Sequence, residues 1–258
     1  MDLIELLQKS RRTVVLTGAG MSTESGLKDF RSNGGLWAGK DPMEIASTRT
    51  IESVRKGEPF NSFIKRIGEF QDFYRWRVEE VMKHEPNEGH RILARWQEKG
   101  IIHRVITQNV DGYHQAAGSK DVITLHGDIR SFRCQHCKRT YTHEWYADNG
   151  PFCDYHDQLG VIRPNIVLFG EGLGDNIGEA FKEAKKADVI IAMGTSLNVS
   201  PANYIPMEGL QTNAKFVIIN RDETAMDKYA HLLINDQDIG NVLQFLDNKL
   251  SSANKPTE

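Results

Sequence analysis

The sequence predicts an α/β protein built on a doubly wound, Rossmann-like parallel sheet, with a smaller domain inserted into it. Short apolar runs rich in β-branched residues alternate with amphipathic segments of helical period, as in strands joined by crossover helices. A polar, cysteine-bearing stretch interrupts this alternation between about residues 130 and 158. The 258 residues of the chain suffice for one large core and a small satellite.

The first elements are a short helix and a strand that runs into a glycine-rich loop. Leucines within residues 3–7 predict the helix, and residues 13–17 form the apolar, β-branched run. Because glycine lets the backbone approach an anion closely, the loop Gly18–Gly26 is a candidate dinucleotide-binding loop. Thr23 stands where the usual Gly-x-Gly-x-x-Gly pattern has its third glycine, so an ordinary strand-to-helix turn is the alternative.

The later elements follow the same alternation. Apolar residues at three- and four-residue steps after Pro59 predict a long amphipathic helix, and Pro86–Asn87 opens a second helix that Gly100 ends. The remaining strands of the parallel sheet are expected over residues 103–107, 166–169, 189–193 and 216–219, and a further strand is expected over residues 122–125, directly before the cysteine-bearing stretch. Further helices are expected over residues 176–187, after Pro201 and around 242–250, before a disordered tail at 251–258.

Small or hydrogen-bonding residues follow each predicted strand of the sheet. In a doubly wound sheet, ligands bind at the carboxyl ends of the strands, so these residues are candidates for contacts with phosphates, ribose hydroxyls and an amide. The sets are Gly18-Ala19-Gly20, Gln108-Asn109-Val110-Asp111, Gly170-Glu171, Gly194-Thr195-Ser196 and Asn220-Arg221-Asp222. Asn109 and Asp111 could orient water or hold a ribose and a carboxamide, whereas an Asx-turn is their ordinary structural explanation.

The three cysteines of the chain have the spacing of a metal site rather than of a disulfide framework. Cys134-x-x-Cys137 is followed after fifteen residues by Cys153-x-x-His156, the pattern of two knuckles that close on one tetrahedral zinc ion. His136 and His143 are the competing candidates for the fourth ligand. No position is left open for a substrate, so we expect a structural zinc ion in an insertion too small to have its own core.

These observations divide the chain into domains. The Rossmann-like domain is expected over residues 1–35, 84–128 and 160–250. The smaller domain consists of a helical module over residues 36–83 and the zinc-binding module over residues 129–159.

Histidine can take up a proton near neutral pH, and the chain has nine, so position must select among them. His126 ends the predicted strand 122–125 directly before the cysteine-bearing module, which places it at the mouth of the cleft expected between the two domains. His114, three residues after Asp111, is the rival general base. A surface or packed histidine is the alternative for each.

Charge and hydropathy exclude several partners. The formal net charge of −3 gives no basic field for nucleic acid, and no apolar run approaches the ~20 residues of a membrane-spanning helix. The N-terminal residues carry acids where a signal peptide needs positive charge. We therefore expect a cytoplasmic protein that binds neither nucleic acid nor membranes, and we expect a monomer.

Several ordered motifs together resemble the sirtuins, a family of NAD-dependent protein lysine deacylases, over about residues 5 to 246. The motifs are Gly18 to Leu27 with Asp29-Phe30-Arg31, Thr107 to Gly112, Leu125-His126-Gly127, Arg163 to Glu171, Gly194 to Leu197 and Ile219-Asn220. The resemblance implies that NAD is consumed as a co-substrate. It also implies acylated-lysine proteins or peptides as partners, and nicotinamide, free lysine and O-acyl-ADP-ribose as products.

The resemblance also implies roles for individual residues. His126, with Asn109 and Asp111, would be catalytic, His126 being the general base that activates a ribose hydroxyl. The peptide would lie between the domains and add a strand near Val167, Phe169 and Gly170. The residues expected to surround NAD are Gly18, Ala19, Gly20, Ser22, Ser25, Asp29, Phe30, Arg31, Trp37, Gln108, Asn109, Asp111, Gly194, Thr195, Ser196, Asn220, Arg221, Asp222 and Ile239.

The chain departs from the family pattern at two positions. Lys28 replaces the usual proline before Asp29, which affects the loop and no expected ligand contact. His156 replaces the last of the usual four cysteines, so a zinc ion is expected on Cys134, Cys137, Cys153 and His156.

A finer expectation concerns the acyl group. Tyr74 and Arg77 lie three residues apart on the amphipathic helix and share a face, so a phenol and a guanidinium can reach one carboxylate. Together with the small Ala46, they resemble the pattern of sirtuins that remove succinyl and malonyl groups. The alternative is a core tyrosine beside a solvated arginine.

Two other functions remain open on the sequence. Protein ADP-ribosyl transfer or simple NAD hydrolysis would use the same NAD-binding residues and His126. A non-catalytic NAD-binding module that uses its zinc element for contacts is a different class altogether.

Overall fold

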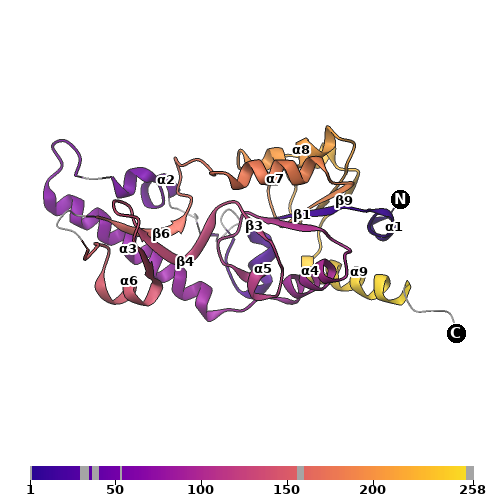
Figure 1. Ribbon diagram of the computed structural model, residues 1–258, viewed down its shortest axis with the longest axis horizontal. Coiled ribbons are helices and arrows are strands. Elements are labelled where there is room, and N and C mark those ends of the chain that lie inside the picture. The colour runs from indigo at the N-terminus through magenta and orange to yellow at the C-terminus, as the bar shows by residue number, and fades with distance from the viewer. Residues whose placement is uncertain (1, 30–34, 37–40, 53, 156–159, 254–258) are drawn as a thin grey trace. The chain divides into compact units, whose positions relative to one another are not determined.

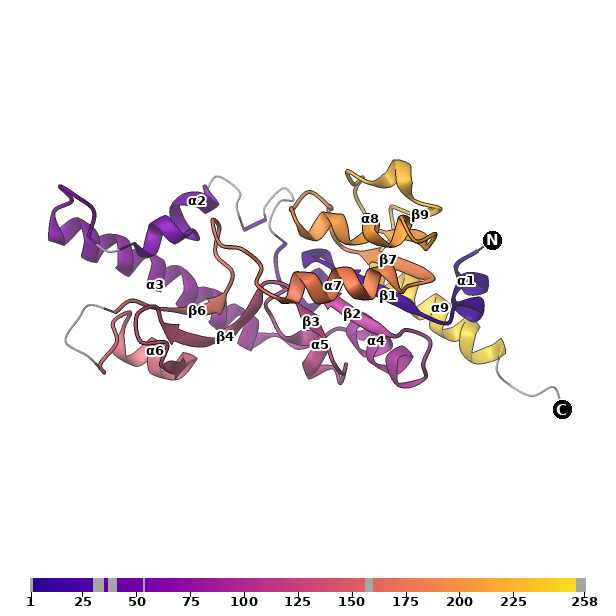
Figure 2. The same ribbon diagram turned by 45° about the horizontal axis from the view of Figure 1, so that its top comes forward.

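The computed structural model describes residues 2–29, 35–36, 41–52, 54–155 and 160–253. The chain forms two compact units, shown in Figure 1 and Figure 2. The first unit comprises residues 1–29, 85–125 and 174–258, and the second comprises residues 30–84 and 126–173. Within the described ranges, no helix has both the length and the apolar character that crossing a membrane requires.

A six-stranded parallel sheet forms the centre of the first unit, in the order β3-β2-β1-β7-β8-β9. Its inner strands β1, β7 and β8 are almost entirely buried, which explains why the sequence shows continuous apolar runs rather than alternation. The strand bounds are β1 Thr13–Thr17, β2 Arg104–Thr107, β3 Ile123–Thr124, β7 Val189–Met193, β8 Lys215–Ile219 and β9 Leu232–Ile234.

Helices cover both faces of this sheet, so the doubly wound architecture is confirmed (Figure 1). Helices α1, α4 and α9 pack on one face through a shared apolar core, and α7 and α8 pack together on the other. The helix bounds are α1 Leu3–Lys9, α4 Glu88–Glu98, α5 Tyr113–Ala116, α7 Asn176–Lys185, α8 Ile205–Leu210 and α9 Ile239–Ala253, with short 3₁₀ turns η1 Ala19–Ser25, η3 Ala202–Tyr204 and η4 Asp227–Tyr229.

Helix ends in the first unit follow the signals in the sequence. Asp2 caps α1 by accepting from the Glu5 N–H, and Asn87 caps α4 by accepting from the His90 N–H. Gly100 has a φ of 72°, the left-handed conformation that commonly ends a helix. The predicted limits of α4 are therefore confirmed by the capping residues that suggested them.

The second unit combines a long helix with a small antiparallel sheet. Helix α3, Phe60–Lys83, buries Phe63, Ile67, Phe70 and Tyr74 along one side. The sheet has the order β5-β4-β6, with pairing that is antiparallel throughout. Its strands are β4 Gly127–Cys134, β5 Thr140–Thr142 and β6 Ile162–Ile166, accompanied by the helices α2 Pro42–Ile45 and α6 His143–Asn149 and the 3₁₀ turn η2 Thr48–Ile51.

Two expectations about elements are wrong, and one strand is missing from the prediction. The segment 166–169 does not form a strand of the parallel sheet, because β6 ends at Ile166 and pairs with β4. A four-residue apolar run cannot show which partner it pairs with. Residues 251–253 continue α9 instead of belonging to a disordered tail, and the sequence pattern omits β9, which has only three residues.

Candidate active site and metal site

The glycine-rich loop of the first unit packs directly on the loop after β7. The Gly18 N–H donates to the Met193 carbonyl at 3.0 Å, and the Gly20 N–H donates to the Gly194 carbonyl at 2.9 Å. A Cβ atom on Gly18 or Gly20 would lie 2.7 Å from the neighbouring loop, at Gly194 or Thr195. Both glycines are thus required by the close approach of two backbone segments, a reason additional to the approach of an anion that the sequence suggested.

A buried polar cluster joins the ends of β1 and β2. The Asn109 amide donates to the Gly18 carbonyl at 3.0 Å and to Ser22 Oγ at 3.1 Å, and Ser22 Oγ donates to Asp111 Oδ2 at 2.7 Å. Asp111 Oδ1 accepts from the Tyr113 N–H at 2.9 Å. The hydrogen bonds hold the two expected catalytic side chains of this unit in one orientation.

The end of β7 adjoins this cluster through Gln108. Its amide donates to Thr195 Oγ1 at 2.9 Å, and Thr195 is buried while Ser196 is partly exposed. The ends of β1, β2 and β7 thus meet at one edge of the parallel sheet, as its topology requires.

The cluster rests on two buried histidines, one of which sequence reasoning missed. His90 Nε2 lies 3.5 Å from Ser22 Oγ, and its ring lies 4.8 Å from that of His114. Burial lowers the pKa of His90 to about 2, with the neighbouring His114 adding to the effect, and burial lowers that of His114 to about 4. His114 Nε2 is 2.9 Å from Thr17 Oγ1. His114 is thus a packed residue that resists protonation, which argues against it as the general base. The capping box that begins α4 was the signal that could have identified His90.

Other candidates of the first unit lie after β8, at the start of α9 and in the glycine-rich loop. The Asn220 amide donates to the Asp222 carbonyl at 2.6 Å. Arg221 and Asp222 form an exposed ion pair with each other at 3.5 Å. Ile239 is buried at the start of α9, and Ala19 is partly exposed.

Ser25 carries a hydroxyl that suits a polar ligand. Its Oγ atom is buried and has no hydrogen-bond partner among the residues that the structure describes. Asp29 is half-buried a few residues later in the same segment. An unpaired buried hydroxyl is costly, so this atom fits a site that a ribose or phosphate group completes. Phe30, Arg31 and Trp37, also expected around NAD, lie outside the described residues.

His126 belongs to the second unit, where a glycine turn orients it. Its carbonyl accepts from the Val167 N–H at 2.9 Å, and its side chain is partly exposed. Gly127 has a φ of 87°, and a Cβ atom there would lie 2.2 Å from the Asn165 carbonyl oxygen. Only glycine fits, so the chain direction at His126 depends on this one position.

Ala46 and the segment that follows β6 lie side by side in the second unit. The Phe169 N–H donates to the Ala46 carbonyl at 3.0 Å, and the Thr48 N–H donates to the Phe169 carbonyl at 2.9 Å. Gly170 has a φ of 92°, and a Cβ atom there would lie 2.9 Å from Thr48 Oγ1. The small Ala46 and the exposed Phe169, both expected at the substrate, are therefore neighbours.

Tyr74 and Arg77 are both buried on α3, with 3% and 7% of their surfaces exposed. Burial raises the pKa of the Tyr74 phenol, an effect that the guanidinium groups of Arg163 and Arg77 oppose. Arg163 is itself 2% exposed and makes a two-pronged ion pair with Glu171. The buried face of α3 and the segment that begins at Arg163 thus share one electrostatic environment, and Arg77 is not the solvated side chain of the alternative interpretation.

The three cysteines form a compact thiol cluster at one end of the antiparallel sheet. The sulfur atoms of Cys134, Cys137 and Cys153 lie within 4.8 Å of one another. Burial raises the pKa of the Cys134 thiol, an effect that the N–H groups of His136 and Cys137, at 3.3 and 3.4 Å from Sγ, oppose. This donor set fits one tetrahedral zinc ion. His156 lies outside the described residues, and His143 contacts Glu144 at 3.2 Å.

Comparisons with known proteins agree with this architecture. The model of the Sir2 family matches residues 18–201. An NAD-dependent protein deacetylase of Oceanobacillus iheyensis is 46% identical over 94% of this chain and 98% of its own length. NAD-dependent protein deacetylase 1 of Geobacillus kaustophilus is 42% identical over 98% of this chain and 99% of its own.

Solved structures resemble the chain over nearly its whole length. A structure described as "Sir2-p53 peptide-NAD+" superposes with a TM-score of 0.81 and 35% identity, covering 98% of this chain and all of that one. A second, "Structure of Sir2Tm bound to a propionylated peptide", has a TM-score of 0.79 and 35% identity, covering 95% and 96% of the two chains.

Proposed function

The chain belongs to the Sir2 family, and we propose that it is an NAD-dependent protein lysine deacylase that releases nicotinamide and O-acyl-ADP-ribose. The observation that carries the proposal is the polar cluster of Ser22, Asn109 and Asp111, which lies at the ligand-binding edge of the parallel sheet. The deacetylase activity named for the relatives and the NAD and peptide named for a solved neighbour support the same conclusion.

The proposed reaction requires the protein to orient the two substrates and to transfer a proton. The acyl oxygen attacks the anomeric carbon of the ribose as the bond between that carbon and nicotinamide breaks. Water then supplies the atoms that complete O-acyl-ADP-ribose and free lysine. The carbon becomes cationic in this step, so the protein must orient the acyl oxygen and exclude competing water. In this proposal Asn109 and Asp111 orient the ribose and amide groups, and His126 takes the proton of a ribose hydroxyl.

Zinc has a structural role in the proposal. Cys134, Cys137, Cys153 and His156 would hold one ion, which leaves no ligand position for a substrate. The ion would replace the apolar core that the short strands of the antiparallel sheet cannot supply.

We also propose that the enzyme accepts acidic acyl groups, succinyl and malonyl, in addition to acetyl. The support is the burial of Tyr74 and Arg77 on one side of α3. A guanidinium and a phenol presented together suit a carboxylate, and a charge-assisted contact is stronger where water is excluded. Arg77 lies one helical turn from Tyr74, so it is the arginine assigned to the acyl carboxylate.

The test of the main proposal is product analysis with the full chain. Acetyl-, succinyl- and malonyl-lysine peptides are incubated side by side with NAD, and the products are identified by mass spectrometry. Free lysine with O-acyl-ADP-ribose is the expected result. Protein-linked ADP-ribose would instead indicate a transferase, and ADP-ribose without deacylation an NAD hydrolase. No turnover with NAD binding retained would indicate a binding module.

A His126→Ala variant that kept full deacylation would contradict the proposed mechanism.

The acyl preference has a separate test in Arg77→Met. We expect this variant to retain deacetylation but to lose at least ~10-fold in desuccinylation, equivalent to ~1.4 kcal/mol from one charge-assisted contact. The measurement is kcat/KM on matched acetyl and succinyl peptides. Lys65→Met, at an exposed position of the same helix, is the control. Equal losses on both peptides would contradict the acidic preference.

A further inference from the structure

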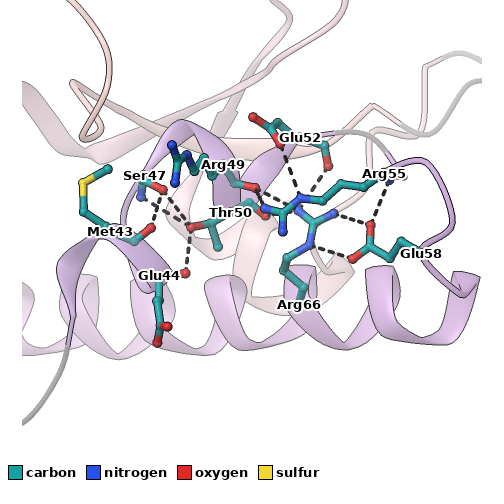
Figure 3. Close-up of polar contacts among 9 residues, drawn as sticks. All are labelled: Met43, Glu44, Ser47, Arg49, Thr50, Glu52, Arg55, Glu58 and Arg66. Carbon is teal, nitrogen blue, oxygen red and sulfur yellow. Dashed lines mark hydrogen bonds and ion pairs between the residues drawn. The ribbon is translucent and has the colours of Figure 1, made fainter.

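An ion pair between Arg66 of α3 and Glu58, which lies just before that helix, fastens the end of the short η2 turn, as Figure 3 shows. The Arg66 guanidinium donates through Nη1 to three carbonyl oxygens: that of Thr50 at 2.6 Å and those of Arg49 and Glu52 at 3.2 Å. Glu58 accepts from Arg66 Nε at 3.1 Å and from Nη2 at 2.9 Å. The carbonyls at the end of a helical turn need donors from outside the turn. Arg66 supplies one to Thr50 and Glu52, and the Arg49 carbonyl accepts from Arg55 Nη2 at 2.5 Å as well as from Arg66.

The pair is well suited to hold its position. The Arg66 and Glu58 side chains are only 15% and 14% exposed, and the guanidinium lies 5.4 Å from the centre of the Phe63 ring. The hydrogen bond from Arg66 lowers the pKa of Glu58 to about 2, with the Arg55 N–H adding to the effect, so the carboxylate stays charged at neutral pH. The planar, two-pronged contact is specific to arginine, because lysine has no such fork.

The fastened turn continues directly into the residues that contact Phe169. Ser47 Oγ donates to the Met43 carbonyl at 2.5 Å, and Thr50 Oγ1 donates to the Glu44 carbonyl at 2.8 Å, so α2 and η2 are bonded into one piece (Figure 3). That piece carries Ala46, whose carbonyl accepts from the Phe169 N–H, and Thr48, whose N–H donates to the Phe169 carbonyl.

We propose that Arg66 and Glu58 are positioning residues for the acyl-lysine site, acting through the α2–η2 piece that aligns Ala46 with Phe169. The inference rests on the proposed function, which places the substrate at Ala46 and Phe169. Neither charged residue contacts substrate; they set the backbone position of the residues that do. Loss of the Arg66 guanidinium removes the donor to the Thr50 and Glu52 carbonyls, whereas the Arg49 carbonyl keeps its bond from Arg55 Nη2. The α2–η2 piece is then held less firmly, so it shifts and its pairing with Phe169 weakens.

The test compares Arg66→Met, Arg66→Lys and Glu58→Gln with Lys65→Met, an exposed neighbour on α3. In Arg66→Met we expect KM for an acetylated peptide to rise about fivefold, while Kd for NAD without peptide changes less than twofold. Arg66→Lys, which keeps the charge and loses the fork, should lie between wild type and Arg66→Met. The control should match wild type. Unchanged KM in the Arg66 and Glu58 variants would overturn the proposal.

Hydrogen–deuterium exchange gives a readout that does not depend on activity. Residues 46–52 and 167–170 are followed together in the same variants. Faster exchange in both segments supports the coupling, and faster exchange in 46–52 alone overturns it.

If Arg66→Met does not fold, Arg66→Lys and Glu58→Gln decide the question. If the wild-type chain removes no acyl group, the proposed function fails, and the exchange data alone decide whether Arg66 controls the segment 167–170.

Discussion

At the scale of single residues, a few positions accept only glycine, because two segments of the chain approach each other closely there. Gly18, Gly20 and Gly127 belong to this class, since a Cβ atom at each would lie within 2.7 Å of another backbone or side-chain atom. The sequence identified the first two through the phosphate-loop pattern. It contained no local signal that Gly127 faces Asn165, which lies 38 positions away and meets it only across the pairing of β4 with β6.

Gly127→Ala is expected to be severe. The added methyl group would clash with the Asn165 carbonyl, and the φ of 87° is itself unfavourable for alanine. We expect a loss of at least ~2 kcal/mol in the free energy of unfolding. Gly57→Ala is the matched control, because Gly57 has a φ of 80° but no atom within 4 Å of the place that an added methyl group would occupy. Urea unfolding of both variants separates the clash from the backbone strain, and equal losses would show that the clash contributes nothing.

The buried histidines predict acid sensitivity. Both pKa values are depressed in the folded state, to about 2 for His90 and about 4 for His114, from an ordinary value near 6.5. Well above pH 6.5 the two imidazoles are neutral in both the folded and the unfolded chain, and the full stability is present. Below it the unfolded chain binds protons that the folded chain refuses, so stability falls as pH falls, by up to ~1.4 kcal/mol per pH unit for each histidine.

The measurement is the free energy of unfolding by urea at pH 7.5, 6.5 and 5.5. A His90→Asn, His114→Asn double variant is expected to show a shallower pH dependence than wild type, whatever its absolute stability. An unchanged slope would mean that the two histidines are not the groups responsible.

At the scale of elements, the path of a short segment outside the sheets depends on contacts with side chains from other parts of the chain. Beyond Ile166, where β6 ends, the following segment is held by the ion pair of Arg163 with Glu171 and by the backbone bonds of Phe169 to the segment 46–48. Glu171 also accepts from the Leu168 N–H at 2.8 Å. This explains how an apolar run that resembled a strand of the parallel sheet keeps a defined path outside any sheet.

Glu171→Gln should weaken this segment. The substitution keeps the size of the side chain but removes the charge that compensates the buried Arg163 guanidinium. We expect the free energy of unfolding to fall by about 2 kcal/mol. Glu69→Gln, at an exposed position of α3, should change it by less than ~0.5 kcal/mol. Thermal and urea unfolding provide the comparison, and similar small effects in both variants would contradict the role given to Glu171.

At the scale of the whole molecule, the two units rely on different sources of stability. The first has an extensive apolar core between its parallel sheet and the helices α1, α4 and α9. The antiparallel sheet of the second is short and ends at the cysteine cluster. Metal removal should therefore affect the second unit first.

We expect the purified protein to contain about one zinc ion per chain, and a chelator to release it with loss of amide protection in residues 127–166 before other regions. Elemental analysis and hydrogen–deuterium exchange are the measurements. His156→Ala should lower the zinc content, whereas His136→Ala and His143→Ala serve as controls that retain it. Normal zinc content in His156→Ala would exclude this histidine as the fourth ligand.

The sequence by itself determined the alternating architecture, the ends of α4, the cysteine spacing and the residues at the strand ends, because these depend on patterns within a few tens of residues. Periodicity, caps and short motifs are local properties. They sufficed to predict that Asn109 and Asp111 lie at the same edge of the sheet as the glycine-rich loop.

The tertiary structure alone decided which segments pair and what each buried charge meets. It assigned β6 to the antiparallel sheet, put His90 beneath Ser22, and joined Arg66 to the turn that carries Ala46. Such contacts link residues far apart in the chain, and the free energy of burying or pairing them depends on surroundings that no local pattern specifies. The glycine loop could be recognised from its own residues, whereas its fit against Gly194 required the folded sheet.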